Sequence, residues 1–496
     1  MFLDLDLLAD YLKPIWPHMI LIIAALIVPA IGMRSRRAAA GFILGASAFA
    51  AFVTAWMMYD GYSGVFESMY AFNDFTALMI MLFLVMLCLI TMMSFTGSES
   101  RNHAGEYFAL LSVATVGMML VCTAEDLISL FIGLELANIM TVALVAFKKN
   151  DPRSSEAAVK YLITGGISTA LFLYGMSLVY GLTGTMNIND IVVCMAGAGL
   201  TWTYILAAVT LIAGFAFKIS LIPFHSWVPD VYEGAPTSVT NFLAVSSKSM
   251  GFIVFFKMFL LLFVAYSLTH TSGVHELQWI FALLAAGTMT LGNIVAISQT
   301  SIKRMLAYSS IAQAGYVIIA VAVATEDALM GGLFYVIVHA FMKGGAFMVV
   351  GALCARGISE NISDYRGLAR RAPLVAFAMM LFLFSLAGIP PLAGFDAKFV
   401  LFSSAVTAAD GMWIWLVVIA VINSAISLYY YARVVKAMYI DKGTTERLKV
   451  PFSYKVPIAI CAIAVILIGV YPMEIIKLCE QAADVFITLF RTATGL

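Results

Sequence analysis

Apolar segments long enough to cross a membrane recur along almost the whole chain. The hydrocarbon core of a bilayer is about 30 Å thick, and a helix needs about 20 residues to span it. By this criterion the sequence predicts about fourteen transmembrane helices. Only 11% of the residues are charged, whereas soluble domains carry about 25%. The chain is therefore predicted to be an all-α polytopic membrane protein, with residues 1–496 in a single membrane domain.

Basic residues follow alternate segments, as the positive-inside rule describes for cytoplasmic loops. They occur after the first, third, fifth, ninth, eleventh and thirteenth segments, at Arg34, Arg36, Arg37, Arg101, Lys148, Lys149, Arg153, Lys303, Arg304, Arg356, Arg366, Arg370, Arg371, Lys436, Lys442, Arg447 and Lys449. The other connections, near residues 60–73, 124, 183–202, 268–277, 325 and 408, contain neither lysine nor arginine. This pattern predicts cytoplasmic odd-numbered loops and places both termini on the outer side.

Several classes of function are disfavoured by what the sequence lacks. Its 28 basic and 28 acidic residues give no net charge, so nothing suggests a face for nucleic acid. The six cysteines are scattered without a CxxC spacing, which disfavours metal, haem and iron–sulfur ligation. No glycine-rich nucleotide motif occurs. We therefore expect no metal, no cofactor-binding site and no redox centre in this chain.

A small set of ionisable residues remains at membrane depth. Its members are Glu135, Lys160, Lys218, His225, Lys248, Lys257, His339, Lys343 and Lys398. A charged side chain at the bilayer centre costs at least about 2.5–3.5 kcal/mol, and such residues usually face a partner or a water-filled path. Single members have structural explanations. A lysine near a helix end can reach the interface, which we expect of Lys257, and a lone glutamate or histidine can bond a neighbouring helix. The whole set together favours function.

One acid among several bases is suited to a proton path. A buried lysine releases its proton readily, and a nearby carboxylate holds the proton on the lysine. If Glu135 approaches Lys218, movement of the glutamate could free that proton. A histidine such as His225 titrates near neutral pH with little perturbation. His339 and Lys343 are four residues apart and share one helical face, an arrangement that favours proton relay over storage.

Two segments are interrupted by proline, each with a lysine close by. Pro223 and Pro236 must break the seventh span, and the pair Pro390 and Pro391 must break the twelfth, because proline removes a backbone donor. Non-helical backbone at membrane depth occurs only where it is buried or lines water. Asp230 and Glu233 follow the first break and are expected to cap the returning half-helix or face the cytoplasmic rim.

The two interrupted segments stand five spans apart, which is the pattern of inverted repeats around a central site. Spans 4–8 (residues 106–268) and 9–13 (residues 278–435) are predicted to be pseudo-equivalent. Spans 1–3 occupy residues 1–97, and residues 450–496 hold the last span and an amphipathic tail. One repeat then contributes Glu135, Lys160, Lys218 and Lys248, and the other contributes His339, Lys343 and Lys398.

Five motifs resemble a known family. They are "GLELANIM", "SSEAAVKYLITGGISTALFLYG", "FKISLIPFHSWVPDVYEGAPTSVTNFLAVSSKSMGF", "IKRMLAYSSIAQAGY" and "GIPPLAGFDAKF". These stretches are similar to the antiporter-like membrane subunits of respiratory complex I, and most similar to subunit N. The resemblance implies a proton-translocating subunit of an NADH:quinone oxidoreductase, or of the archaeal relative that oxidises a reduced deazaflavin. It further implies a bacterial or archaeal plasma membrane, lipid contact, neighbouring antiporter-like and small membrane subunits, and flavin, Fe–S and quinone sites in partner subunits.

The resemblance assigns relay roles to Glu135, Lys160, Lys248, Lys398 and the pair Lys218 and His225. The chain departs from the family at two places. Gln313 stands where many relatives have a histidine, so no titrating group is available there. His339 with Lys343 is closer to the larger antiporter-like subunits and to cation/proton antiporters.

Two alternatives stay open at this point. One is a subunit of a multisubunit cation/proton antiporter or a membrane-bound hydrogenase, and the other is a scaffold that transports nothing. The sequence leaves the electron donor, the choice of H⁺ or Na⁺, and the direction of transport undecided.

Overall fold

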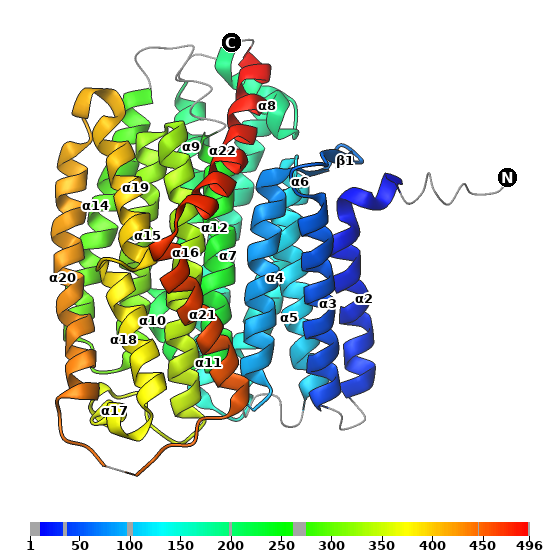
Figure 1. The fold of residues 1–496 in the computed structure, drawn as a ribbon. Coiled ribbons are helices and arrows are strands. Elements are labelled where there is room, and N and C mark those ends of the chain that lie inside the picture. Colours follow the sequence, from blue (N-terminus) through cyan, green and yellow to red (C-terminus); the bar gives the residue numbers. More distant parts are fainter. Residues whose placement is uncertain are drawn as a thin grey trace.

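The structure is a computed structural model that describes residues 10–32, 37–96, 103–197, 201–260, 274–444 and 446–494. Arg34, Arg36 and Arg101 of the predicted cytoplasmic loops lie outside the described residues. Figure 1 shows an upright bundle of long helices with one small β-hairpin at its upper end.

The elements follow one another in chain order. The helices are α2 (Trp16–Gly32), α3 (Arg37–Met58), α4 (Asp74–Ser94), α5 (Ala104–Thr123), α6 (Leu127–Val145), α7 (Pro152–Thr183), α8 (Ile188–Gly197), α9 (Trp202–Ile219), α10 (Trp227–Gly234), α11 (Thr237–Phe242), α12 (Lys248–Phe255), α14 (Val274–Ser298), α15 (Ile302–Val323), α16 (Glu326–Cys354), α17 (Leu368–Arg371), α18 (Pro373–Ala387), α19 (Ala393–Thr407), α20 (Ile414–Tyr439), α21 (Phe452–Val470) and α22 (Met473–Thr494). Short 3₁₀ turns are η1 (Lys13–Ile15), η4 (Ile362–Tyr365) and η5 (Ala408–Gly411), and π-helical turns are η2 (Leu243–Ser247) and η3 (Phe256–Leu260). Strands β1 (Gly64–Phe66) and β2 (Tyr70–Phe72) pair antiparallel, with Gly64 opposite Phe72.

Side-chain caps fix where many of the long helices begin. Asn73 forms a capping box at α4, and Asp126 and Asp151 cap α6 and α7. Ser301 and Thr325 accept backbone N–H groups at the starts of α15 and α16. Such caps satisfy helix N–H groups that have no partner within the helix. The polar residues of the short connections therefore define the two ends of the bundle.

The chain is an all-α polytopic membrane protein, as the sequence predicts. Thirteen helices among the described residues are long and apolar enough to cross a membrane, and α18 is a shorter apolar helix. The twelfth predicted span is divided at Pro390 and Pro391 into α18 and α19, of 15 residues each, so neither half is long enough alone.

The most buried helices occupy the centre of the bundle. The segment Thr237–Met258 is buried throughout, and α15 and α16 nearly so. Helices α2, α3, α7, α20 and α21 expose much of their surface; Figure 1 places α20 at one edge and α2 and α3 at the other. Lys248 lies on α12 and Lys343 on α16. Two of the predicted site lysines thus belong to the innermost helices.

Both interrupted spans end their first half in the same way. Helix α9 ends at Ser220 and α18 at Gly388, and each of these residues has a left-handed backbone, with φ of 64° and 89°. The backbone N–H of each bonds back to two carbonyls of the preceding turn. A left-handed residue is a common helix stop. These equivalent breaks are consistent with the two predicted runs of five spans.

The predicted amphipathic tail forms α22, which packs against α4, α8 and α16. Its residues Cys479, Ala482 and Ala483 are fully buried. Just before it, Gly469 of α21 lies against the backbone of the α18–α19 break. The C-terminal segment therefore packs along the bundle beside the second interrupted span.

Candidate functional site

Four lysines of the sequence-predicted set are buried in the interior of the bundle. Lys218, Lys248, Lys343 and Lys398 are 4%, 2%, 0% and 5% exposed. Each donates to hydroxyl or carbonyl oxygens, and none of the four forms an ion pair within the described chain. A buried ammonium held only by neutral acceptors retains a large desolvation cost. Each of these ammonium groups is therefore held by hydroxyl and carbonyl oxygens alone.

Lys218 lies at the end of α9, just before the first break. Its Nζ donates to the Tyr161 hydroxyl on α7 at 3.1 Å. The rings of Tyr161, Phe217 and Trp227 pack together around it, and Trp227 Nε1 donates to the Phe217 carbonyl at 3.2 Å. The half-helix α10 that returns after the break therefore closes an aromatic enclosure over Lys218.

Lys248 and Lys343 meet on two consecutive serines of α15. Lys248 Nζ donates to the Ser310 carbonyl and hydroxyl at 2.8 and 2.9 Å, and Lys343 Nζ donates to the Ser309 hydroxyl at 2.7 Å. The π-helical turn η2 ends directly before Lys248, and such turns are frequent at functional sites. His339 is buried beside these two cations, and its Nε2 has no hydrogen-bond partner among the described residues. Lysines from different helices are thus brought into electrostatic contact.

Lys398 uses the second break as its acceptor site. Its Nζ donates to the carbonyls of Leu386 and Ala387 at 3.1 and 2.9 Å and to the Ser424 hydroxyl at 2.7 Å. Those two carbonyls lie in the last turn of α18, where no following helical turn competes for them. Gln313 Nε2 donates to the same Leu386 carbonyl at 3.2 Å. The residue that replaces the family's histidine therefore shares an acceptor with Lys398.

Gly388 leaves the space that Lys398 occupies. A Cβ at this position would lie 3.0 Å from Lys398 Cδ and 3.3 Å from Nζ, and the backbone is left-handed. We expect Gly388→Ala to destabilise the fold by about 1–2 kcal/mol, because L-residues other than glycine disfavour this backbone conformation. The measurement is thermal unfolding of the detergent-solubilised protein. Gly287→Ala is the matched control, since that helical position has open space around it and gains helix propensity; equal stability of the two variants would contradict the expectation.

The predicted Glu135–Lys218 ion pair is absent from this structure. Glu135 is half-buried and accepts hydrogen bonds from Asn138 at 2.8 Å and Thr169 at 2.7 Å. Thr169 and Tyr161, the partner of Lys218, are eight residues apart on α7, which is about 12 Å of helical rise. The carboxylate and the ammonium therefore lie at different depths along the bundle.

Lys160 and the two acids after the first break form a cluster at one end of the bundle. Lys160 pairs with Asp230 at 2.6 Å and with Glu156 at 2.8 Å. Arg304 of α15 bridges Asp230 and Glu233 at 2.9 Å each. Neither acid caps the half-helix through its side chain, because both carboxylates bond to basic side chains; the alternative expectation, that they face the cytoplasmic rim, stays a prediction. The cluster connects α10 to α7 and to α15, and so joins the two repeats. The ion pairs of Asp230 and Glu233 could not be predicted from the sequence, because their partners are far apart in the chain.

His225 lies within the first break, apart from Lys218. It is half-buried, and its Nδ1 has no hydrogen-bond partner among the described residues. No described hydrogen bond joins it to Lys218, whose Nζ is bonded to Tyr161. Transfer between the two therefore requires an intermediate group.

Lys257 extends to the loop between α5 and α6 at the end of the bundle, where its ammonium is buried rather than exposed to water. It is 4% exposed, and its Nζ donates to the carbonyls of Cys122 and Ala124 and to Glu125 at 3.3 Å. The pair is buried, since Glu125 is only 8% exposed. Sequence reasoning missed Glu125 because it stands in a short loop rather than within a predicted span.

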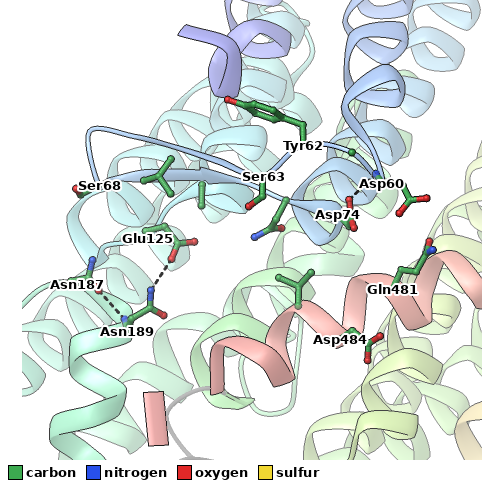
Figure 2. A pocket seen from close by; sticks show the side chains of 15 residues that line it. Asp60, Tyr62, Ser63, Ser68, Asp74, Glu125, Asn187, Asn189, Gln481 and Asp484 are labelled. Atoms are coloured by element: carbon green, nitrogen blue, oxygen red, sulfur yellow. Dashed lines mark hydrogen bonds between the residues drawn. The ribbon is translucent and has the colours of Figure 1, made fainter. Parts of the chain in front are cut away.

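Glu125 also lines a pocket of about 760 Å³ at the end of the bundle that carries the β-hairpin (Figure 2). Carboxylates of Asp60, Asp74 and Asp484 line the same pocket. Glu125 accepts a hydrogen bond from Asn189 at 3.3 Å within it. At its rim Tyr59 bonds to Gln481 of α22, and burial together with the nearby Asp74 and Asp60 raises the pKa of Tyr59. The pocket is acidic and open to water.

Residues 124–427 match the protein family described as "NADH:quinone oxidoreductase/Mrp antiporter, TM". This range covers the four buried lysines, both breaks and the serine pair. The chain belongs to this family. The resemblance noted in the sequence is thereby confirmed. Groups of three or more His, Cys, Asp or Glu residues that could hold a metal ion are not found in the described parts of this family member.

Relatives within the family are similar over most of their length. The chain is 45% identical to F(420)H(2) dehydrogenase subunit N of Methanosarcina mazei over 82% of this chain and 83% of that protein. It is 42% identical to NADH-quinone oxidoreductase subunit N of Desulforamulus reducens over 85% and 87% of the two chains. Among solved structures, a chain of respiratory complex I from Thermus thermophilus is 28% identical, with a TM-score of 0.78 over 93% of this chain and 98% of that one.

Proposed function

We propose that this protein is a proton-translocating membrane-arm subunit of a complex I-type respiratory dehydrogenase. One observation carries the proposal, namely that Lys248 and Lys343 are buried side by side on the consecutive serines Ser310 and Ser309. A fold gains nothing from two buried cations that repel each other. A proton path needs such groups, because each repulsion helps the next proton to leave.

The names of two relatives support electron transfer to a quinone-type acceptor as the reaction to which proton translocation is coupled. They are named as subunits N of an F(420)H(2) dehydrogenase and of an NADH-quinone oxidoreductase. In this proposal the chain is part of an enzyme but holds no redox centre, and flavin, iron–sulfur and quinone sites belong to partner subunits. The energy of electron transfer reaches this chain as changes in charge or position at its flanks.

Within the chain, the proposed relay runs through the buried lysines of the first repeat and then through those of the second. Lys218 and Lys248 act in the first repeat, with His225 as an accessory group at the break. Lys343 and Lys398 act in the second repeat, with His339 beside Lys343. Lys160 holds Asp230 at the cytoplasmic end of the path.

Polar groups on two flanks support neighbouring membrane subunits as partners. Glu135 is half-buried on α6, next to the exposed side chains of Ile132 and Ile139. On another flank a largely apolar cavity of about 490 Å³ between α19 and α20 opens onto Lys398. Ionisable groups at membrane depth require protein or water around them rather than lipid. Other antiporter-like and small membrane subunits are the proposed neighbours, and lipid covers the remaining surface.

The proposed location is the plasma membrane of a bacterium or archaeon, with both termini outside. Helix α2 begins, and α22 ends, at the same end of the bundle (Figure 1). The basic helix α17 lies at the opposite end, which the positive-inside rule assigns to the cytoplasm.

Reconstitution of the assembled complex tests the function. We expect the complex purified through this chain to acidify or alkalinise the lumen of liposomes when NADH or a reduced deazaflavin and a quinone-type acceptor are supplied. The measurement is quenching of a pH-sensitive dye, with an uncoupler as the control. A pH change driven by a Na⁺ gradient without any electron donor would instead support a cation/proton antiporter, the alternative that His339 with Lys343 favours.

A further inference from the structure

The link between Lys343 and Lys398 is the least complete part of the path described above. Both lysines are buried, but they donate to different acceptors, Lys343 to Ser309 and Lys398 to the second break and Ser424. Gln313 lies in this region and cannot titrate, because its side chain is an amide. Some other group must carry a proton across the gap if the proposed function holds.

Helix α20 turns a run of hydroxyl groups toward this gap. Serine is common where membrane helices pack, but here two inward serines are joined by a tyrosine on the same face, as Ser424, Ser427 and Tyr431. They are spaced at i, i+3 and i+7, so they lie on one helical face. Ser427 and Tyr431 are 0% exposed. The outward neighbour Tyr429 is 62% exposed and shows that tyrosine itself does not select the interior.

The two ends of this hydroxyl face are each connected to one of the lysines. At one end the Tyr431 hydroxyl forms a short hydrogen bond with the Ser309 hydroxyl, which in turn accepts from Lys343. At the other end Ser424 accepts from Lys398 and donates to the Ala387 carbonyl at 2.8 Å. The row of three α20 hydroxyls therefore starts at Tyr431, which bonds to the acceptor of Lys343, and ends at Ser424, which is itself an acceptor of Lys398.

The spacing along the face suits a chain of single waters. Side chains three or four residues apart on a helix are about 5–6 Å apart at Cβ, so one water can bridge the hydroxyls of Ser424 and Ser427, whose oxygens are one bond from Cβ. The side chain of Tyr431 leans toward the N-terminal turn of its helix, as helical side chains do, and thus toward Ser427. Ser427 donates to the Ser424 carbonyl at 2.6 Å, so its oxygen remains free to accept.

We propose that Ser424, Ser427 and Tyr431 of α20, called here the α20 hydroxyl ladder, conduct the proton between Lys343 and Lys398. The inference rests on the proposed function. In one passage the Lys343 ammonium gives up one proton to the ladder and the neutral Lys398 amine takes up one. Each hydroxyl accepts one proton and passes on its own, so the ladder ends chemically unchanged and no electrons move.

A structural reading of the same hydroxyls makes a different prediction. Serine on the inner face of a helix can simply bond to the preceding turn, as Ser427 does. Tyr107 of α5 provides the comparison, because its hydroxyl is equally buried and donates to Ser238 at 2.8 Å, away from both lysines and from Ser309. Loss of either tyrosine hydroxyl removes buried hydrogen bonding, and only Tyr431 belongs to the ladder.

The test uses the assembled complex in liposomes with dye quenching as the readout. We expect Tyr431→Phe to lower the initial rate of proton translocation at least tenfold, whereas Tyr107→Phe and Tyr429→Phe stay within twofold of the wild type. Both Tyr107→Phe and Tyr431→Phe should lower the thermal unfolding temperature by similar amounts. Gln313→His in the Tyr431→Phe background should recover at least threefold in rate, since imidazole restores a titrating group in the gap.

Two results would overturn the ladder while leaving the proposed function intact. In the first, the wild-type complex translocates protons and the Tyr431→Phe complex retains more than half of the wild-type rate. The other is an equal loss of rate for Tyr107→Phe and Tyr431→Phe that parallels their loss of thermal stability. If Tyr431→Phe does not assemble, Ser427→Ala takes its place, with an expected threefold loss of rate, and an unaltered rate contradicts the ladder. A wild type that shows no donor-driven pH change refutes the proposed function itself.

Discussion

Replacing Lys343 by methionine is expected to lower proton translocation by at least tenfold without weakening the fold. The Lys343 side chain is completely buried, at 0% exposed. Its described hydrogen-bond partner is the Ser309 hydroxyl, at 2.7 Å. Methionine has a similar length but no proton to exchange. Removing a buried cation that Lys248 repels also relieves a desolvation cost, so thermal stability should be unchanged or higher. The translocation rate is measured by dye quenching in liposomes, and stability by thermal unfolding of the solubilised complex.

Two controls separate proton exchange from charge and packing at this position. Lys343→Arg keeps a cation that does not deprotonate, and should therefore be as inactive as the methionine variant. Lys436→Met makes the same chemical change at an exposed side chain near the end of α20 and should pump normally. A Lys343→Met complex that translocates protons at the wild-type rate per electron would show that this lysine is no carrier. A loss of activity that merely follows a loss of assembly would point to packing instead.

The breaks at Ser220 and Gly388 show how much of the fold follows from the sequence. Proline at 223, 236, 390 and 391 identifies both interrupted spans, because a missing donor and a steric clash act locally. The number and order of the spans follow equally from their apolar lengths. The left-handed residue that ends each first half is harder to anticipate, since Ser220 has none of glycine's conformational freedom.

The partners of the buried lysines could not be predicted from the sequence in the same way. Lys248, Lys343 and Lys398 stand out because charge in an apolar segment is rare. Their acceptors Ser310, Ser309, Ser424 and the carbonyls near Gly388 do not, because serine and backbone oxygens occur everywhere. The sequence suggests Glu135 as the partner of Lys218, because Glu135 is the only acid among the ionisable residues at membrane depth. In the structure Lys218 instead donates to the Tyr161 hydroxyl. Tertiary contact decides between such acceptors, and spacing along the chain does not.

The arginine and acids near the first break extend this point to the link between the repeats. Asp230 lies in the first turn of the half-helix α10, where the helix dipole favours an acid, but Glu233 lies in its last turn, where the dipole does not. In the structure Arg304, which comes from the other repeat, holds both of them. The same contact that satisfies α10 thus couples its position to α15, the helix that carries the serine pair.

Glu125→Gln is expected to destabilise the fold by about 3 kcal/mol, because it leaves the Lys257 ammonium buried with no counter-charge. The side chains of the pair are only 5% and 10% exposed, and in the variant Lys257 keeps only uncharged acceptors, namely two backbone carbonyls and the amide oxygen of the substituted side chain. The measurement is thermal unfolding of the solubilised protein. Glu474→Gln is the matched control, since it breaks the exposed Lys477–Glu474 pair at 3.4 Å and such surface pairs contribute about 0–1 kcal/mol.

The double variant Glu125→Gln with Lys257→Met distinguishes a buried ion pair from a general requirement for glutamate in this loop. Removing both partners takes away the attraction and the desolvation cost together, so most of the lost stability should return. The alternative is that Glu125 acts mainly through Asn189, which donates to it at 3.3 Å in the pocket of Figure 2. In that case the double variant would be no more stable than Glu125→Gln, because the asparagine contact is changed in both. Recovery in the double variant would instead identify Lys257 as the group that makes Glu125 necessary.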